Sequence, residues 1–115
     1  MDRAEDDLTG TLFRVATRGL ESRTLLVLAG QLGLDASVRL RDEAEVLAAQ
    51  ARDVDLDWGE TQTVTASSLQ VLLALGVTLS KRGRALRVTA DNPGIRHLLE
   101  LSGLSACFPR SELIT

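Results

Sequence analysis

Hydroxyl-bearing residues cluster at the start of a strongly apolar segment, where Thr65, Ser67 and Ser68 precede the run Leu69–Leu75. The first amides of a helix lack partners within the helix and its start carries partial positive charge, so a phosphate on Ser67 would be well tolerated there. Adding about two negative charges would alter an apolar interface at this helix start. The same residues also fit a capping box, in which Ser67 accepts from the amide of Gln70 and the Gln70 side chain bonds back. The sequence therefore leaves two interpretations of Ser67, a switch and a cap.

The other groups that could do chemistry stand apart from one another. His97 is the only histidine and is expected on a solvated helix surface, and Cys107 lies among apolar residues, which is typical of a buried, inert thiol. Asp55 and Asp57 fall on one side of a strand, but two carboxylates make a weak magnesium site and are better interpreted as solvated charges. We therefore expect no enzymatic activity, no metal site and no cofactor.

The elements that position the hydroxyl cluster can be predicted from hydrophobic patterning. Residues 12–17 and 24–29 are expected to form an antiparallel hairpin, and the second run lacks alternation, which predicts a central strand covered on both faces. Further strands are expected at 54–58 and 86–89, and the polar stretch Gly59–Thr63 is expected to be a loop.

Apolar residues at spacings of three and four predict helices over 36–51, 67–82 and 93–102. Asp35 or Ser37 is expected to cap the first, and Asn92 followed by proline is a strong start for the third. Gly103 is expected to end that helix in a left-handed conformation. The tail from Cys107 to Thr115 is expected to form a short last strand or a turn of helix.

Strands that alternate with helices after a first hairpin predict an α/β fold with a mixed, mainly parallel sheet. We expect four to five strands and three to four helices in one domain over residues 10–115, preceded by an acidic leader over residues 1–9.

Composition narrows the function further. The chain has 115 residues, 44% of them hydrophobic and 25% charged, with a formal net charge of -3. An acidic balance disfavours nucleic acid as a partner, and no apolar run approaches the roughly 20 residues of a membrane span. The acidic N-terminus lacks the layout of a secretion signal, so we expect a cytoplasmic protein without direct membrane insertion.

The order of these motifs resembles the STAS domain family, whose best-known members are the anti-sigma factor antagonists. The resemblance extends from about Leu25 to Phe108. It is carried by Gly30-Gln31-Leu32, Val54-Asp55-Leu56, the hydroxyl turn, Leu69-Gln70-Val71-Leu72-Leu73, Lys81-Arg82-Gly83, Asn92-Pro93 and Leu98-Leu99-Glu100-Leu101-Ser102-Gly103-Leu104.

The resemblance implies a non-catalytic signalling module that docks another protein at the start of its second helix. Antagonist members carry Asp-Ser-Ser-Gly at the turn, where this chain has Thr65-Ala66-Ser67-Ser68, which places Ser67 at the phosphoacceptor position. The implied partner is an anti-sigma factor or serine kinase, and the implied role is the regulation of transcription in bacteria. STAS-like subunits of lipid-transport permeases have similar non-acidic turns, and a permease subunit is the alternative partner. The expected partner-binding residues are Thr65, Ala66, Ser67, Ser68 and Gln70, together with the adjoining stretch Gly59–Thr63.

Overall fold

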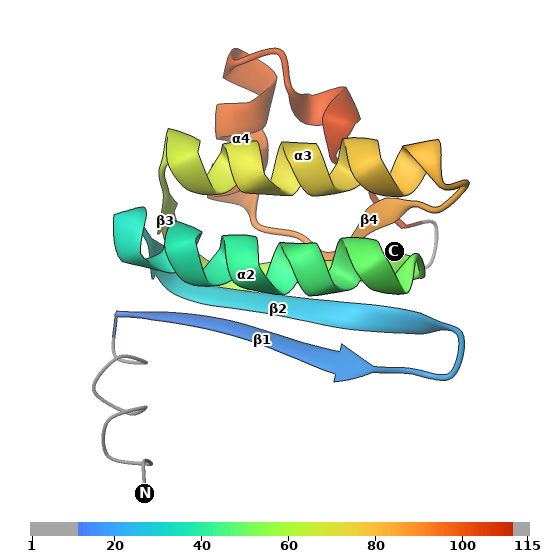
Figure 1. Cartoon of the computed structure of the whole chain (residues 1–115). Helices are drawn as coiled ribbons and strands as arrows, with labels where there is room; N and C mark the ends of the chain where they lie inside the picture. The colour runs from blue at the N-terminus through green and yellow to red at the C-terminus, as the bar shows by residue number, and fades with distance from the viewer. Residues whose placement is uncertain (1–11, 112–115) are drawn as a thin grey trace, which may run out of the picture.

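The central sheet joins four strands in the order β1-β2-β3-β4 (Figure 1). β1 (Phe13–Gly19) pairs antiparallel with β2 (Arg23–Leu32), and β2, β3 (Asp53–Val64) and β4 (Leu86–Ala90) run parallel to one another. The computed structural model describes residues 12–111, so the leader over 1–9 and the tail residues 112–115 lie outside the described part. The mixed sheet and the hairpin predicted from the sequence are confirmed.

Within the described residues, three helices follow β2, β3 and β4 in turn: α2 (Leu34–Gln50), α3 (Ala66–Lys81) and α4 (Pro93–Leu101). A 3-10 helix spans Ser105–Cys107, and Arg110 forms an isolated parallel bridge with Val88 of β4. The start of α4 is as predicted, because the Asn92 side chain accepts from the amides of Gly94 and Ile95. Gly103 has φ +75°, as expected for the residue that ends this helix.

Two local predictions are wrong because nonlocal pairing overrides local pattern. The stretch Gly59–Thr63 is strand, since β3 continues along the whole of β2 to a last pair between Leu32 and Val64. The start of α2 is not capped by Asp35 or Ser37: Gly33 is the N-cap, and Ser37 lies inside the helix, where its hydroxyl donates to the Leu34 carbonyl at 2.6 Å.

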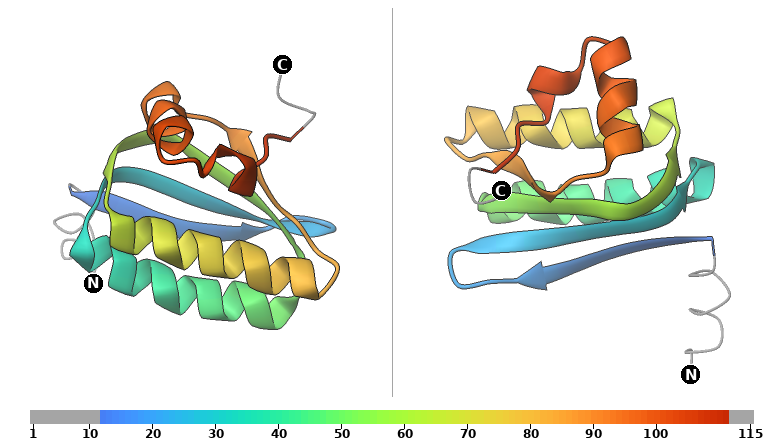
Figure 2. Two further views of the ribbon diagram at one scale, coloured as in Figure 1. Left: turned by 90° about the horizontal axis from the view of Figure 1, so that it is seen from above. Right: turned by 180° about the vertical axis from the view of Figure 1, so that it is seen from behind.

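The sheet is covered by α2 and α3 on one face only, which contradicts the expectation of a central strand buried on both sides. Leu26 and Leu28 of β2 are fully buried, whereas the alternate residues Leu25, Val27 and Ala29 are half-buried. Successive side chains of a strand point to opposite faces. Seen from behind in Figure 2, β1 and β2 lie in front of the two helices, with no helix of the described chain over them.

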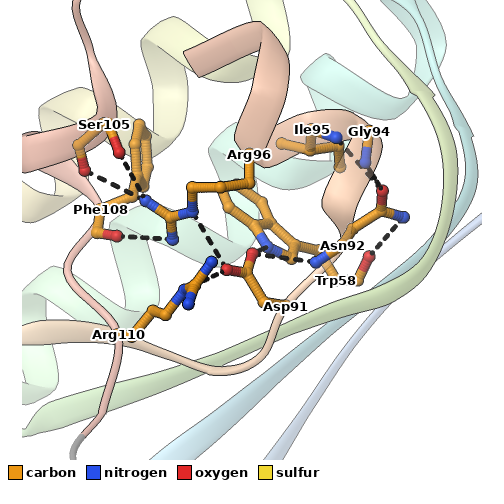
Figure 3. Close-up of polar contacts among 9 residues, drawn as sticks. All are labelled: Trp58, Asp91, Asn92, Gly94, Ile95, Arg96, Ser105, Phe108 and Arg110. Atoms are coloured by element: carbon orange, nitrogen blue, oxygen red, sulfur yellow. Dashed lines mark hydrogen bonds and ion pairs between the residues drawn. The ribbon is translucent and has the colours of Figure 1, made fainter. Parts of the chain in front are cut away.

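The corner between β4, α4 and the C-terminal segment is held by Asp91 (Figure 3). Its carboxylate accepts from Trp58 Nε1 at 2.9 Å, from Arg96 Nε at 3.0 Å and from Arg110 Nε at 2.7 Å. Arg96 is itself buried and also donates to the carbonyl of Phe108 at 2.9 Å. One carboxylate thus ties the β3–β4 core to α4 and to the segment that follows it.

Two buried threonines of the sheet differ in whether the side-chain hydroxyl has a hydrogen-bond partner. Thr24 and Thr61 are 4% and 5% exposed; Thr61 Oγ1 donates to the Leu28 carbonyl at 3.2 Å, whereas Thr24 Oγ1 has no partner among the described residues. Thr24→Val is expected to raise the free energy of unfolding by about 1 kcal/mol, because it removes a hydroxyl that folding strips of water without replacing its hydrogen bond.

Thr61→Val is the matched control and is expected to lower the free energy of unfolding by about 1 kcal/mol, since it deprives a buried carbonyl of its donor. Urea unfolding followed by circular dichroism measures both values. Equal shifts of the same sign in the two variants would contradict the assignment of Thr24 as the unsatisfied member.

Candidate functional site

The hydroxyl-rich turn joins β3 to α3 and is fixed to the end of β2. Thr65 is the N-cap of α3, with extended backbone angles, and both its amide and its Oγ1 donate to the Leu32 carbonyl at 3.1 Å. Ser68 Oγ donates to the same carbonyl at 3.1 Å. Three donors on one carbonyl hold the start of α3 against the β2–α2 junction, so the turn is a rigid part of the scaffold.

Ser67 is oriented by Thr65, since their hydroxyl oxygens lie 2.9 Å apart. A hydroxyl has one proton, and that of Thr65 is committed to the Leu32 carbonyl, so Ser67 is the donor in this pair. The capping-box interpretation is wrong, because Ser67 is the second residue inside the helix and the N-cap side chain makes no capping bond. The hydroxyl of Ser67 is therefore not needed to begin α3.

The predicted partner-binding residues separate into surface and core. Thr65, Ala66 and Gln70 are exposed and Ser67 is half-buried, whereas Ser68 is fully buried beneath the turn and does not reach the surface. Nothing in the sequence indicated that Ser68 alone is buried, because the carbonyl that accepts from its hydroxyl, that of Leu32, lies 36 residues earlier in the chain. The surface at this helix start is thus formed by four of the five residues expected.

The turn opens onto a groove of about 630 Å³ between α2 and α3. Leu34 and Val38 of α2 are 72% and 50% exposed, and their large apolar side chains lie at the mouth of the groove. The charged residues on the α2 side of the groove are Arg41 and Glu45. The lining residues are Leu34, Ser37, Val38, Arg41, Ala44, Glu45 and Ala48 of α2, and Ser67, Gln70, Val71, Ala74, Leu75 and Thr78 of α3.

The contribution of α2 was missed from the sequence. Its signal was present in the apolar pair Leu34 and Val38, four residues apart and therefore neighbours on one helix face, outside the stripe that packs on the sheet. Because the predicted helix begins at residue 36, Leu34 lies outside it.

The remaining candidate groups form no site. His97 is exposed on α4 as expected, but the prediction of a buried thiol is wrong, because Cys107 ends the 3-10 helix with its side chain exposed. Asp55 pairs with Arg23 at 3.3 Å. Within residues 12–111 no group of histidine, cysteine and carboxylate side chains is arranged to hold a metal ion. None of the helices in this range is long and apolar enough to cross a membrane.

Comparison with known families gives a match over residues 15–114, to the family described as "Mlab, STAS domain". A search of curated proteins finds no match. Several solved structures share the fold. An anti-sigma factor antagonist from Mycobacterium paratuberculosis superposes with a TM-score of 0.77 and 17% identity, over 91% of this chain and 90% of that one.

The anti-sigma factor antagonist SpoIIAA in its unphosphorylated form matches with a TM-score of 0.71 and 14% identity, over 87% of this chain and 90% of that one. The Bacillus cell fate determinant SpoIIAA in the phosphorylated form matches with a TM-score of 0.65 and 15% identity, over 87% and 93% of the two chains. At these identities the structural matches establish the fold, and the α2–α3 groove with its hydroxyl turn remains the feature to interpret.

Proposed function

This chain belongs to the STAS domain family, and we propose that it is a non-catalytic, cytoplasmic interaction module that docks a protein partner in the groove between α2 and α3. The observation that carries the proposal is the position of Ser67 at the rim of an open, largely apolar groove. Concave apolar surfaces with a few polar groups at the rim are the usual form of a specific docking site. The proposed contact residues are Thr65, Ala66, Ser67 and Gln70, joined by Leu34 and Val38.

The first candidate role is that of an anti-sigma factor antagonist-like regulator, whose partner is an anti-sigma factor or serine kinase and whose docking is controlled at Ser67. Two features support it. Ser67 is partly accessible and its hydroxyl is not required for capping, so a phosphate there would not unfold α3. It would place about two negative charges at the rim of the groove and weaken the docking of an apolar partner surface.

The second candidate role is that of an accessory subunit bound to a membrane permease complex through the same groove. The turn favours it, because Thr65 occupies the position of the aspartate in the antagonist motif. Thr65 accepts the hydrogen bond of Ser67, as an aspartate could, but contributes no charge. The groove would then be a permanent docking surface rather than a switched one.

The docking site can be tested with the products of neighbouring genes as partners, either a serine kinase or a permease with its ATPase. Val38→Arg is expected to weaken binding at least about tenfold, or about 1.4 kcal/mol, because it places a charge in the apolar mouth of the groove. Val46→Arg is the matched control: Val46 lies on the same helix with 52% exposure but does not line the groove, so binding should stay unchanged. Calorimetric titration measures both affinities.

Variants of Ser67 separate the two roles. Ser67→Glu should weaken binding of a signalling partner about tenfold, and Ser67→Ala should change the free energy of unfolding by less than about 0.5 kcal/mol, since no cap is lost. Mass spectrometry after incubation with the neighbouring kinase and ATP should find phosphate on Ser67. Unmodified Ser67 together with full binding by the Glu variant would reject the switch, and equal effects of Val38→Arg and Val46→Arg would reject the groove.

A further inference from the structure

The uncovered face of the sheet carries an apolar strip along β2. Leu25, Val27 and Ala29 are half-buried there, and Ala16 of β1 lies beside Val27 in the antiparallel register. The view from behind in Figure 2 shows this side of β1 and β2 without a helix of the described chain over it. Apolar side chains in adjacent positions on an open sheet face are typical of a surface that packs against another protein.

Charges of opposite sign flank the strip. On the same face, β1 presents the exposed Arg14 and Arg18, the partners of Ala29 and Leu25. On the other side of β2, the parallel register places three aspartates of β3 in one row. They are Asp53, Asp55 and Asp57, next to Arg23, Leu25 and Val27. On this face β1 is therefore basic, the strip along β2 is apolar and β3 is acidic.

This arrangement of charges is complementary to one partner surface, the same face of a second copy of the chain. If two such faces stack with a two-fold axis parallel to β2, each β1 lies over β3 of the partner and the two apolar strips meet. An axis across the strands would instead stack β1 on β1, with arginine against arginine. Pairing of two β1 edges would also bring these arginines together. We propose that the chain forms a symmetric face-to-face dimer with its two-fold axis along β2.

The aspartates retain the capacity to accept from a partner. Asp53 Oδ1 accepts from the Ala85 amide at 2.9 Å and Asp57 Oδ1 from the Gly59 amide at 3.1 Å, which leaves the second oxygen of each carboxylate to accept. Asp55 is paired with Arg23, which is 39% exposed. Two further charges lie on this face. Glu60 of β3 is exposed beside Ala29 and extends the acidic row, and Arg87 of β4 is exposed beside Asp55 but lies beyond the strands that meet in this arrangement.

The proposed interface is small, about 14 Å across three strands and about 20 Å along them. Its area is below that of a standard protein interface, so the dimer is expected to be weak and sensitive to salt. Since α2 and α3 cover the opposite face, the α2–α3 groove stays open in both copies. The dimer is therefore independent of the proposed docking function.

Sedimentation equilibrium of the purified chain tests the proposal through charge reversal. Arg14→Glu with Arg18→Glu, and separately Asp57→Lys, should each weaken self-association at least about tenfold, because like charges then face each other across the axis. An equimolar mixture of the two variants should associate more tightly than the Arg14→Glu, Arg18→Glu chain alone, since one side of the mixed dimer keeps the unchanged arginines against the unchanged aspartates and the lysine introduced at position 57 offsets part of the repulsion on the other side. Arg39→Glu with Arg84→Glu, a matched change in net charge at exposed sites off the face, should leave association unchanged.

Val27→Lys is a second disrupting variant, and unlike Asp57→Lys it removes no side-chain hydrogen bond within the chain. This variant should also reduce self-association at least about tenfold, because the two copies of residue 27 meet near the axis. Circular dichroism verifies the fold of each variant. A wild-type chain that stays monomeric to its solubility limit overturns the proposal. So does a dimer that survives Val27→Lys, or a mixture of charge-reversed chains that associates no more tightly than the Arg14→Glu, Arg18→Glu chain alone.

Discussion

Replacing Asp91 by Asn is expected to lower the free energy of unfolding by about 3–5 kcal/mol, the largest effect of any single substitution considered for this chain. The Asp91 side chain is 14% exposed and that of its partner Arg96 is 9% exposed. Without the carboxylate charge, the Arg96 guanidinium stays buried with only neutral acceptors, Ser105 and the Phe108 carbonyl. Urea unfolding followed by circular dichroism gives the loss.

The effect should depend on pH in a defined direction. Burial raises the pKa of Asp91, but hydrogen bonds from Trp58, the Asn92 amide, Arg96 and Arg110 outweigh it and hold the pKa below its ordinary value. A carboxyl group with a lowered folded pKa contributes its full stabilisation above the unfolded value of about 3.9 and loses it as the pH falls through the folded value. The difference between wild type and Asp91→Asn should therefore be constant near neutral pH and shrink below about pH 4.

Asp55→Asn is the matched control for this prediction. Its carboxylate is as buried as that of Asp91, 13% exposed, but it pairs with an arginine that is 39% exposed and can return to water. The expected loss is within about 1 kcal/mol. Similar losses in Asp55→Asn and Asp91→Asn would show that burial of the arginine partner does not decide the cost.

Gly30→Ala is expected to destabilise the chain by about 3 kcal/mol or more, the second large effect. Gly30 has φ +81°, and a Cβ there would collide with the Leu12 carbonyl. That carbonyl is held in place because it accepts from the Gln31 amide at 2.5 Å. A left-handed conformation costs a residue with a side chain about 1–2 kcal/mol, and overpacking adds about 1–3 kcal/mol.

Gly83→Ala separates the two contributions. Gly83 also has a positive φ, +74°, but no atom of the described chain outside its immediate neighbours lies within 4 Å of the Cβ position. Only the conformational cost of about 1 kcal/mol should remain. Thermal unfolding of both variants tests this, and a loss in Gly83→Ala as large as that in Gly30→Ala would remove the collision from the explanation.

Features set by local chemistry were predictable from the sequence. The start of α4 follows from Asn92 before proline, and its end follows from Gly103, because caps depend on residues a few positions apart. The hairpin and the helix positions followed in the same way from apolar spacing. The Asp91 cluster was not predictable, because its partners Trp58 and Arg110 are 33 and 19 residues distant and an aspartate before Asn-Pro resembles any turn residue.

The candidate site was predictable only in part, for the same reason. Hydroxyls at a helix start mark a surface turn by composition, but the burial of Ser68 and the orientation of Ser67 depend on the Leu32 carbonyl at the end of another strand. The open sheet face was missed because an unbroken apolar run looks the same whether one or both faces are covered. The half-exposed Leu25, Val27 and Ala29 could be distinguished only once the helices were placed.

The position of Trp58 has an optical consequence. The sequence contains one tryptophan and no tyrosine, and this indole is fully buried, bonded to Asp91, with its ring centroid 5.3 Å from that of Phe108. Indole emission from the native chain therefore originates at one place, the junction of β3, α4 and the C-terminal segment. A red shift of this emission would report the release of that segment while α2 and α3 still give a helical signal. Because Trp58 does not line the groove, occupancy of the groove by a partner without tryptophan should leave the spectrum unchanged.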